Sequence, residues 1–105
     1  QYVVENNLVT KVCMTVPAES PHGIQGIGDG RDFLANPENM ESVIVVETGA
    51  AIERAKAFAK STGLLVGISS GANLIAAERY VANHNFEGVA VTMLCDRGER
   101  YMTIY

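Results

Sequence analysis

Apolar residues follow two different spacings along this chain. In four short stretches they stand next to one another and include many β-branched residues, which predicts buried strands. These stretches are residues 11–16, 41–47, 64–66 and 89–94. In two longer stretches, 49–62 and about 70–83, they recur every three or four positions, which predicts amphipathic helices. Strands that alternate with helices predict an α/β fold, with a parallel sheet and covering helices.

The predicted helices carry end signals and an apolar stripe. Thr48 stands where the first helix begins and is expected to cap it, and Gly63 fits its C-terminal cap. The stripe of the second helix that is expected to face the core consists of Leu74, Ala77 and Val81. Residues 17–39 contain all three prolines and predict a long irregular loop, a type of segment that often serves binding.

Three turns are expected at the carboxyl ends of the predicted strands. They are the glycine loop around 26–28, the turn Ser69-Ser70 and the turn Cys95-Asp96. Ligands of parallel α/β sheets bind beyond the carboxyl ends of the strands. The sequence therefore predicts a ligand site where the three turns meet, without naming the ligand.

Residues 67–71 match the Gly-x-Ser-x-Gly pattern of a hydrolase nucleophile elbow. A nucleophilic Ser69 would need a histidine base, which follows the acid in α/β-hydrolases. No histidine follows Asp96, and His84 is expected at an exposed helix end, so a serine hydrolase is the weaker reading. In the alternative, Ser70 caps the helix and the hydroxyl of Ser69 faces the strand ends, where a ligand would lie.

Composition narrows the classes of function. The net charge is −4 and lysine and arginine form no cluster, which argues against nucleic acid and acidic membranes as partners. Two distant cysteines, Cys13 and Cys95, and no signal peptide favour a cytoplasmic setting, although one disulfide is conceivable. Both histidines are isolated, so no metal site is expected. No apolar run approaches the roughly 20 residues of a membrane span.

Three motifs, in this order, resemble one enzyme family. They are Pro-His-Gly-Ile-Gln-Gly-Ile-Gly at 21–28, Leu-Leu-Val-Gly-Ile-Ser-Ser-Gly-Ala at 64–72 and Gly-Glu-Arg-Tyr at 98–101. Together they resemble the C-terminal part of the cysteine synthase (O-acetylserine sulfhydrylase) family, which are pyridoxal phosphate (PLP) enzymes related to cystathionine β-synthase. The resemblance implies a partial tryptophan-synthase-β-like large domain, PLP fold type II. Residues 1–105 would be the C-terminal portion of the β-replacement enzyme domain.

The resemblance also implies roles for particular residues. Ser69 would donate a hydrogen bond to the pyridine nitrogen of PLP, and Cys95 and Asp96 would form the turn beside the ring. Gly26, Ile27 and Gly28 would line the substrate side of the cofactor. The complete enzyme would combine O-acetylserine, or O-phosphoserine, with sulfide to give cysteine, and would be a homodimer.

Some features of the family have no match in these residues. The Schiff-base lysine, the asparagine loop for the substrate carboxylate and the loop for the PLP phosphate are all missing. The chain also begins without methionine and stops after an apolar run, so we expect a piece of a longer protein that is inactive alone. A cystathionine β-synthase or diaminopropionate-type relative stays open, as does a non-catalytic half-enzyme or assembly module that needs a partner chain.

Overall fold

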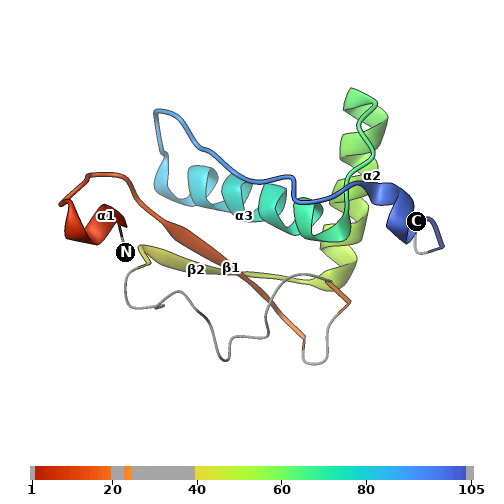
Figure 1. Cartoon of the computed structure of the whole chain (residues 1–105), viewed down its shortest axis with the longest axis horizontal. Coiled ribbons are helices and arrows are strands. Elements are labelled where there is room, and N and C mark those ends of the chain that lie inside the picture. The colour runs from red at the N-terminus through yellow and green to blue at the C-terminus, as the bar shows by residue number, and fades with distance from the viewer. Residues whose placement is uncertain (1, 20–22, 25–39, 104–105) are drawn as a thin grey trace.

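A small parallel sheet lies against one long helix, which a second helix crosses steeply (Figure 1). The computed structural model describes residues 2–19, 23–24 and 40–103. The elements are α1 (Tyr2–Glu5), β1 (Cys13–Pro17), β2 (Ser42–Val46), α2 (Thr48–Thr62), α3 (Ile68–His84) and the 3-10 helix η2 (Gly98–Tyr101). The predicted α/β class is confirmed. Among the described residues, no helix is both long enough and apolar enough to cross a membrane.

The two strands run parallel, as the sequence predicts. β1 and β2 pair from Cys13 opposite Ser42 to Pro17 opposite Val46. The continuous apolar run of β2 predicts a strand buried on both faces, but only one face is covered. Val46 is fully buried, whereas Val43 and Val45 on the other face are about half exposed. Helix α3 covers the first face, and none of the described residues buries the second.

The core lies where α2, α3 and the end of β2 meet. Its buried members are Ile24, Val46, Ala51, Ile68, Ala72 and Ala76. The two helices approach so closely that a Cβ on Gly71 would lie 2.1 Å from the carbonyl oxygen of Ala51. Only glycine fits this contact, which brings the start of α3 directly against the first turns of α2.

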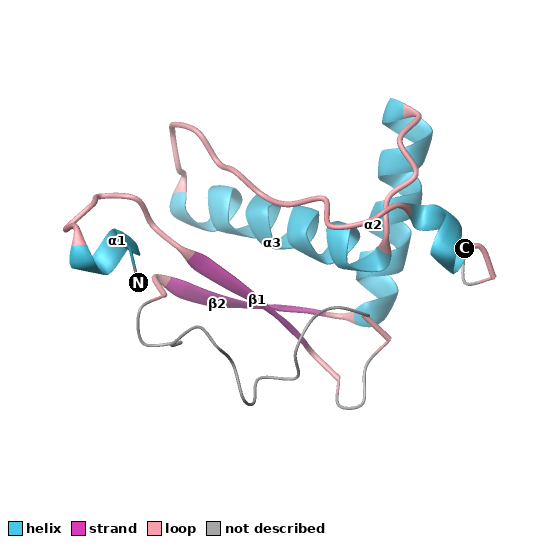
Figure 2. Ribbon diagram, in the orientation of Figure 1, coloured by secondary structure: helices cyan, strands magenta, loops and turns pink. Residues whose placement is uncertain are grey.

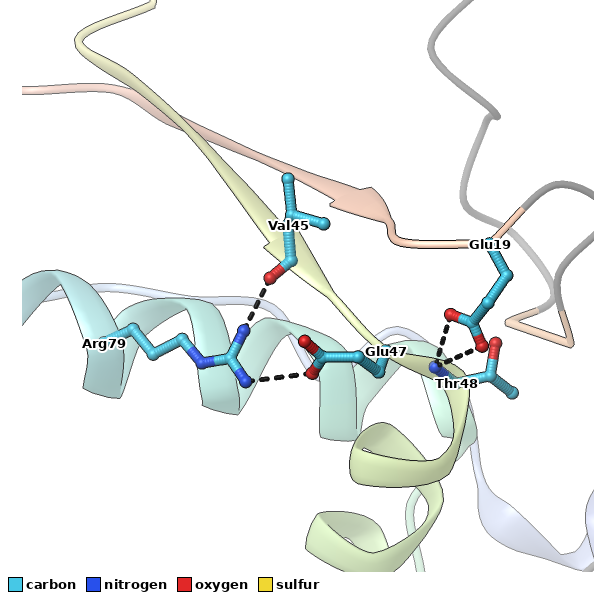
Figure 3. A network of polar contacts seen from close by, with 5 residues as sticks. All are labelled: Glu19, Val45, Glu47, Thr48 and Arg79. Carbon is cyan, nitrogen blue, oxygen red and sulfur yellow. Dashed lines mark hydrogen bonds and ion pairs between the residues drawn. The ribbon is translucent and has the colours of Figure 1, made fainter.

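One of the two predicted caps of α2 is confirmed and the other is wrong. Gly63 ends the helix in the left-handed conformation (φ 77°), and its N–H donates to the carbonyl of Ala59. Thr48 is already helical, and the cap position belongs to Glu47, whose side chain makes no capping bond. The carboxylate of Glu19 instead accepts the N–H of Thr48 at 2.9 and 3.1 Å (Figure 3). A distant acceptor therefore replaces the local cap.

The predicted core stripe of α3 is displaced. The residues that α3 buries are Ile68 to Ala72 and Ala76, whereas Leu74, Ala77 and Val81 are only half buried. The predicted helix start is also two residues late, since α3 begins at Ile68.

Two of the predicted strands are absent from the described residues. The stretch 64–66 makes only an isolated antiparallel bridge between Val66 and Arg97. The stretch 89–94 runs beside α3 as an exposed loop (Figure 2). A strand needs a neighbouring strand for its backbone groups, and no described strand lies beside 89–94.

Candidate functional site

The turn after residue 94 is fastened to the beginning of α3. The N–H of Cys95 donates to the hydroxyl oxygen of Ser70 at 3.0 Å. The N–H of Gly67 donates to the carbonyl of Asp96 at 2.9 Å, and the N–H of Gly98 donates to that of Leu65 at 2.9 Å. Two of the three turns that the sequence places together therefore do meet, although about 25 residues separate them.

Ser70 does not cap the helix. α3 begins at Ile68 and its cap position is Gly67, so Ser70 already lies inside the first turn. Its side chain is fully buried, and its hydroxyl accepts a bond from the turn at 95–96 rather than from its own helix. The predicted capping role is thus wrong, because a tertiary donor takes the place of the local one.

Ser69 stands beside Ser70 but is used differently. It is 5% exposed, and its hydroxyl makes no hydrogen bond to any residue that the structure describes. A serine hydroxyl can both donate and accept, and a nearly buried hydroxyl in a protein usually has a partner. Ser69 therefore offers an available donor at the first turn of α3.

Asn73 is a site residue that the sequence reasoning missed. Its side-chain amide donates to the carbonyl of Met93 at 3.0 Å and lies 3.7 Å from the sulfur of Cys95. It follows Ser69 and Ser70 by four and three positions, a spacing that puts side chains on one face of a helix. This spacing in the sequence could have identified Asn73 as a site residue. Cys95 itself is exposed, and both cysteines are free thiols, so the conceivable disulfide is not formed.

The glycine loop lies outside the described residues at Gly26, Ile27 and Gly28, but the residues that lead into it are placed. The N–H of Gly23 donates to the hydroxyl of Thr48 at 3.2 Å. Ile24 is fully buried in the core cluster that also contains Ile68. Gly23 and Ile24 therefore lie close to the beginnings of both α2 and α3.

A second polar network ties α3 to the end of β2, away from the turn at 95–97. The guanidinium of Arg79 donates to the carbonyl of Val45 and to the carboxylate of Glu47, the latter at 3.0 Å (Figure 3). The hydrogen bond from Arg79 is the main cause that lowers the pKa of the Glu47 carboxyl. A hydrogen bond from the backbone of Glu47 and the positive charge of Arg79 lower this pKa further. This network holds α3 against the end of β2 and contributes no group to the candidate site.

The described residues give Ser69 no histidine base. His84 ends α3, fifteen residues beyond Ser69, which at about 1.5 Å per residue is roughly 22 Å. Its ring nitrogen lies 3.0 Å from the carbonyl of Tyr80, and its ring stacks on the ring of that tyrosine. His22 lies outside the described residues. The nucleophile reading therefore gains no support from this geometry.

Known proteins resemble this chain in sequence over most of its length. Cysteine synthase B of Campylobacter jejuni is 45% identical over 83 residues, which make up 78% of this chain and 27% of that protein. The cysteine synthase of Staphylococcus aureus is 38% identical over 86 residues, which cover 79% of this chain and 27% of that protein. The chain thus spans little more than a quarter of these curated relatives. No protein-family model matches it.

The comparison of folds finds the same kind of enzyme. The crystal structure of a cysteine synthase from Entamoeba histolytica matches 96% of this chain with a TM-score of 0.83 and 29% sequence identity. The match takes up 33% of that enzyme's chain. In sequence and in fold, this chain therefore resembles a C-terminal segment of cysteine synthases, and its structural neighbours are PLP enzymes of fold type II.

Proposed function

We propose that this chain is part of a cysteine synthase, an enzyme that replaces the β-substituent of O-acetylserine or O-phosphoserine with sulfide. The support is the likeness to cysteine synthases in both sequence and fold. Since the chain spans about a quarter to a third of those proteins, the activity belongs to the complete enzyme.

The observation that carries the proposal is the state of Ser69. Ser69 is nearly buried as a residue, its hydroxyl has no hydrogen-bond partner among the described residues, and it lies beside a turn that Ser70 holds in place. This fits the pyridine nitrogen of PLP, which a hydroxyl can reach as a donor. When bound, PLP supplies the electron sink of the reaction. A neutral hydroxyl does not keep the ring nitrogen protonated as a carboxylate would, which suits elimination and replacement at the β-carbon.

The other candidate residues take positions around the ring. In this proposal Cys95 and Asp96 border the edge of the pyridine, while Gly26, Ile27 and Gly28 line the substrate side. The bond from Cys95 to Ser70 and the contacts of Asn73 with Met93 hold the turn at 95–96 in register with Ser69.

The lysine that holds PLP would come from elsewhere in the enzyme. Lys11 pairs with Glu41, and Lys56 pairs with Glu53 on α2, so both stand in surface ion pairs. In this proposal, residues 1–105 are the C-terminal portion of the catalytic domain and are inactive alone. The complete protein would be a cytoplasmic homodimer that takes a small amino acid and sulfide.

The test is a chimera in which this chain replaces the matching segment of the Campylobacter jejuni cysteine synthase B. We expect the chimera to bind PLP and to make cysteine. Ser69→Ala should weaken PLP binding about tenfold, one lost hydrogen bond, and should shift the visible absorbance of the bound cofactor. Ser61→Ala, on the exposed side of α2, is the control and should change neither.

Two results would contradict the proposal. One is a Ser69→Ala chimera whose PLP affinity and spectrum equal those of the parent. The other is cysteine formation by the 105-residue chain alone, which would overturn the assignment of the lysine to another part of the enzyme. Labelling of Ser69 by a fluorophosphonate probe would instead favour the hydrolase reading.

A further inference from the structure

Four hydrogen bonds join the segment 93–98 to residues 65–73, and we call this series the ladder. The ladder runs antiparallel, like the bridge between Val66 and Arg97, because the partners move back along the chain as residues 65–73 move forward. Its members are the bonds from the N–H of Gly98 to the carbonyl of Leu65, from the N–H of Gly67 to the carbonyl of Asp96, from the N–H of Cys95 to the hydroxyl of Ser70, and from the side-chain amide of Asn73 to the carbonyl of Met93.

The ladder changes from backbone bonds to side-chain bonds where α3 begins. Inside a helix the carbonyl groups bond to N–H groups four residues later, so they are not free to pair with a neighbouring segment. Ser70 and Asn73 continue the ladder with their side chains. Ser70 supplies an acceptor and Asn73 supplies a donor, three positions apart on one face of α3. These are the two kinds of group that the edge of a strand would supply.

Asn73 makes the last bond of the ladder among the described residues. The next positions on that face of α3 are Ala76 and Ala77, whose side chains cannot form a hydrogen bond. On the other segment, the backbone groups of residues 89–92, which precede Met93, make no hydrogen bond to any described residue. Asn73 is therefore the first point at which α3 holds the segment that leads into the turn at 95–96.

Hydrogen bonds rather than packing hold the end of this segment. Met93 is 67% exposed and Cys95 is exposed, so burial fixes neither side chain. The nitrogen of the Asn73 amide lies 3.0 Å from the carbonyl oxygen of Met93 and 3.7 Å from the sulfur of Cys95. A side-chain amide carries two N–H hydrogens, so Asn73 can donate to both acceptors.

We propose that Asn73 is a positioning residue for the cofactor. Its two donors fix the backbone of Met93 and the sulfur of Cys95, and the resulting placement of the turn at 95–96 sets how tightly PLP is held and how its ring absorbs light. Asn73 touches no part of the cofactor in this proposal and acts through Cys95. The assignment rests on the proposed function, in which Cys95 and Asp96 border the pyridine ring.

The experiment uses the chimera described above, with Asn73→Leu as the variant. Leucine keeps the branched shape of asparagine but has no donor. In the PLP-free chimera, amide hydrogen exchange at Cys95 should become at least fivefold faster, because the bond from its N–H to Ser70 becomes the last of the ladder. In the loaded chimera, PLP should bind about fivefold more weakly, which corresponds to one lost neutral hydrogen bond, and its visible absorbance should shift.

Asn73→Asp is a second variant, and Asn83→Leu is the matched control. Aspartate keeps the shape of asparagine but, as a carboxylate, faces two acceptors without a donor, so its effects should be at least as large as those of leucine. Asn83 is an exposed asparagine of the same helix. Asn83→Leu should change the exchange rate at Cys95 and the affinity for PLP less than twofold and should leave the absorbance unchanged.

Three results would overturn the proposal. Exchange at Cys95 that stays at the parent rate in both Asn73 variants would show that Asn73 does not hold the turn. Faster exchange with unchanged PLP affinity and absorbance would show that Asn73 has a structural role only. Effects of Asn83→Leu as large as those of Asn73→Leu would show that the position on α3 does not matter.

This proposal and the proposed function fail in different ways. A parent chimera that binds no PLP would contradict the proposed function. Normal PLP binding by the parent and by both Asn73 variants would contradict only the role of Asn73. Because exchange at Cys95 is measured without PLP, it tests the ladder in either case.

Discussion

The two sides of α3 differ sharply in how fully other residues cover them. On the side of α2, Gly71 lies against the backbone of Ala51, and residues of both helices are fully buried. On the other side, α3 borders an open apolar cavity that β1 and residues 86–92 also line, and the segment 89–94 is exposed. The comparison shows that this chain closes its own packing on one side and, on the other, leaves a sheet edge that no described residue pairs.

Small residues line the closed side, and one ion pair lies at its rim. Ala51 and Ala55 of α2 are fully buried, and Arg54 pairs with Glu78 of α3 at 2.7 Å. Small side chains let two helices approach, and close approach increases dispersion contacts. The candidate site lies at this side, so Ser69 and Ser70 are held on a rigid base.

The largest effect on this comparison is expected from Gly71→Ala. The new Cβ would lie 2.1 Å from the carbonyl oxygen of Ala51, so the helices must separate. We expect a loss of about 3 kcal/mol in the free energy of unfolding, measured by urea denaturation, despite the better helix propensity of alanine.

Gly49→Ala is the control for that change. A Cβ at Gly49 meets nothing within 4 Å, so the same substitution in α2 should be neutral or stabilising by about 0.5 kcal/mol. Equal destabilisation by the two changes would show that the closed side is not tightly packed.

The second test truncates one valine on each side. Val46→Ala removes two methyl groups from the closed core and should cost about 2 kcal/mol in urea denaturation. Val91→Ala should cost less than about 0.5 kcal/mol, because that side chain is 86% exposed. A comparable loss at Val91 would mean that this side chain is packed in the free chain and that the two sides of α3 do not differ.

The third test is Ser70→Ala, which removes the acceptor of the Cys95 N–H. The N–H would lose its partner, and we expect a cost of about 1 kcal/mol together with faster hydrogen exchange at Cys95. Ser61→Ala removes a comparable hydroxyl from an exposed position and should leave both quantities unchanged. Unchanged exchange at Cys95 in Ser70→Ala would contradict the role of Ser70 in holding the turn.

Sequence patterns predicted what depends on neighbours within this chain. The parallel pair, both helices and the Gly63 cap follow from local spacing and local backbone preferences, and all are observed. The strand at 89–94 and the stripe of Leu74, Ala77 and Val81 were read correctly as apolar, but the described residues leave 89–94 exposed and cover the stripe only in part. A hydrophobic pattern records the surroundings for which a sequence is suited, whether or not they are present.

The sequence predicted where the candidate site lies but not the hydrogen bonds that its residues make. The rule that ligands bind at the carboxyl ends of parallel strands placed the turns at 69–70 and 95–96 together, and they do meet. Capping preferences then misassigned Ser70 and Thr48, because their partners, Cys95 and Glu19, lie 25 and 29 residues away. Local propensity carries no information about such distant partners.

The smallest expected effect concerns the bond between Arg79 and Glu47, which ties α3 to the end of β2. Because this bond lowers the pKa of Glu47 in the folded chain, its stabilisation is complete above the ordinary glutamate pKa of about 4.3 and is lost as the pH falls through the lowered value. Arg79→Met should raise the pKa of Glu47 toward the ordinary value, as measured by NMR titration, and should make stability depend less on pH in acid. Arg54→Met, which breaks the pair with Glu78, should leave the pKa of Glu47 where it is. Both partners are largely exposed, so the change in stability should be the least of the four. A Glu47 pKa that does not move in Arg79→Met would contradict the bond between Arg79 and Glu47.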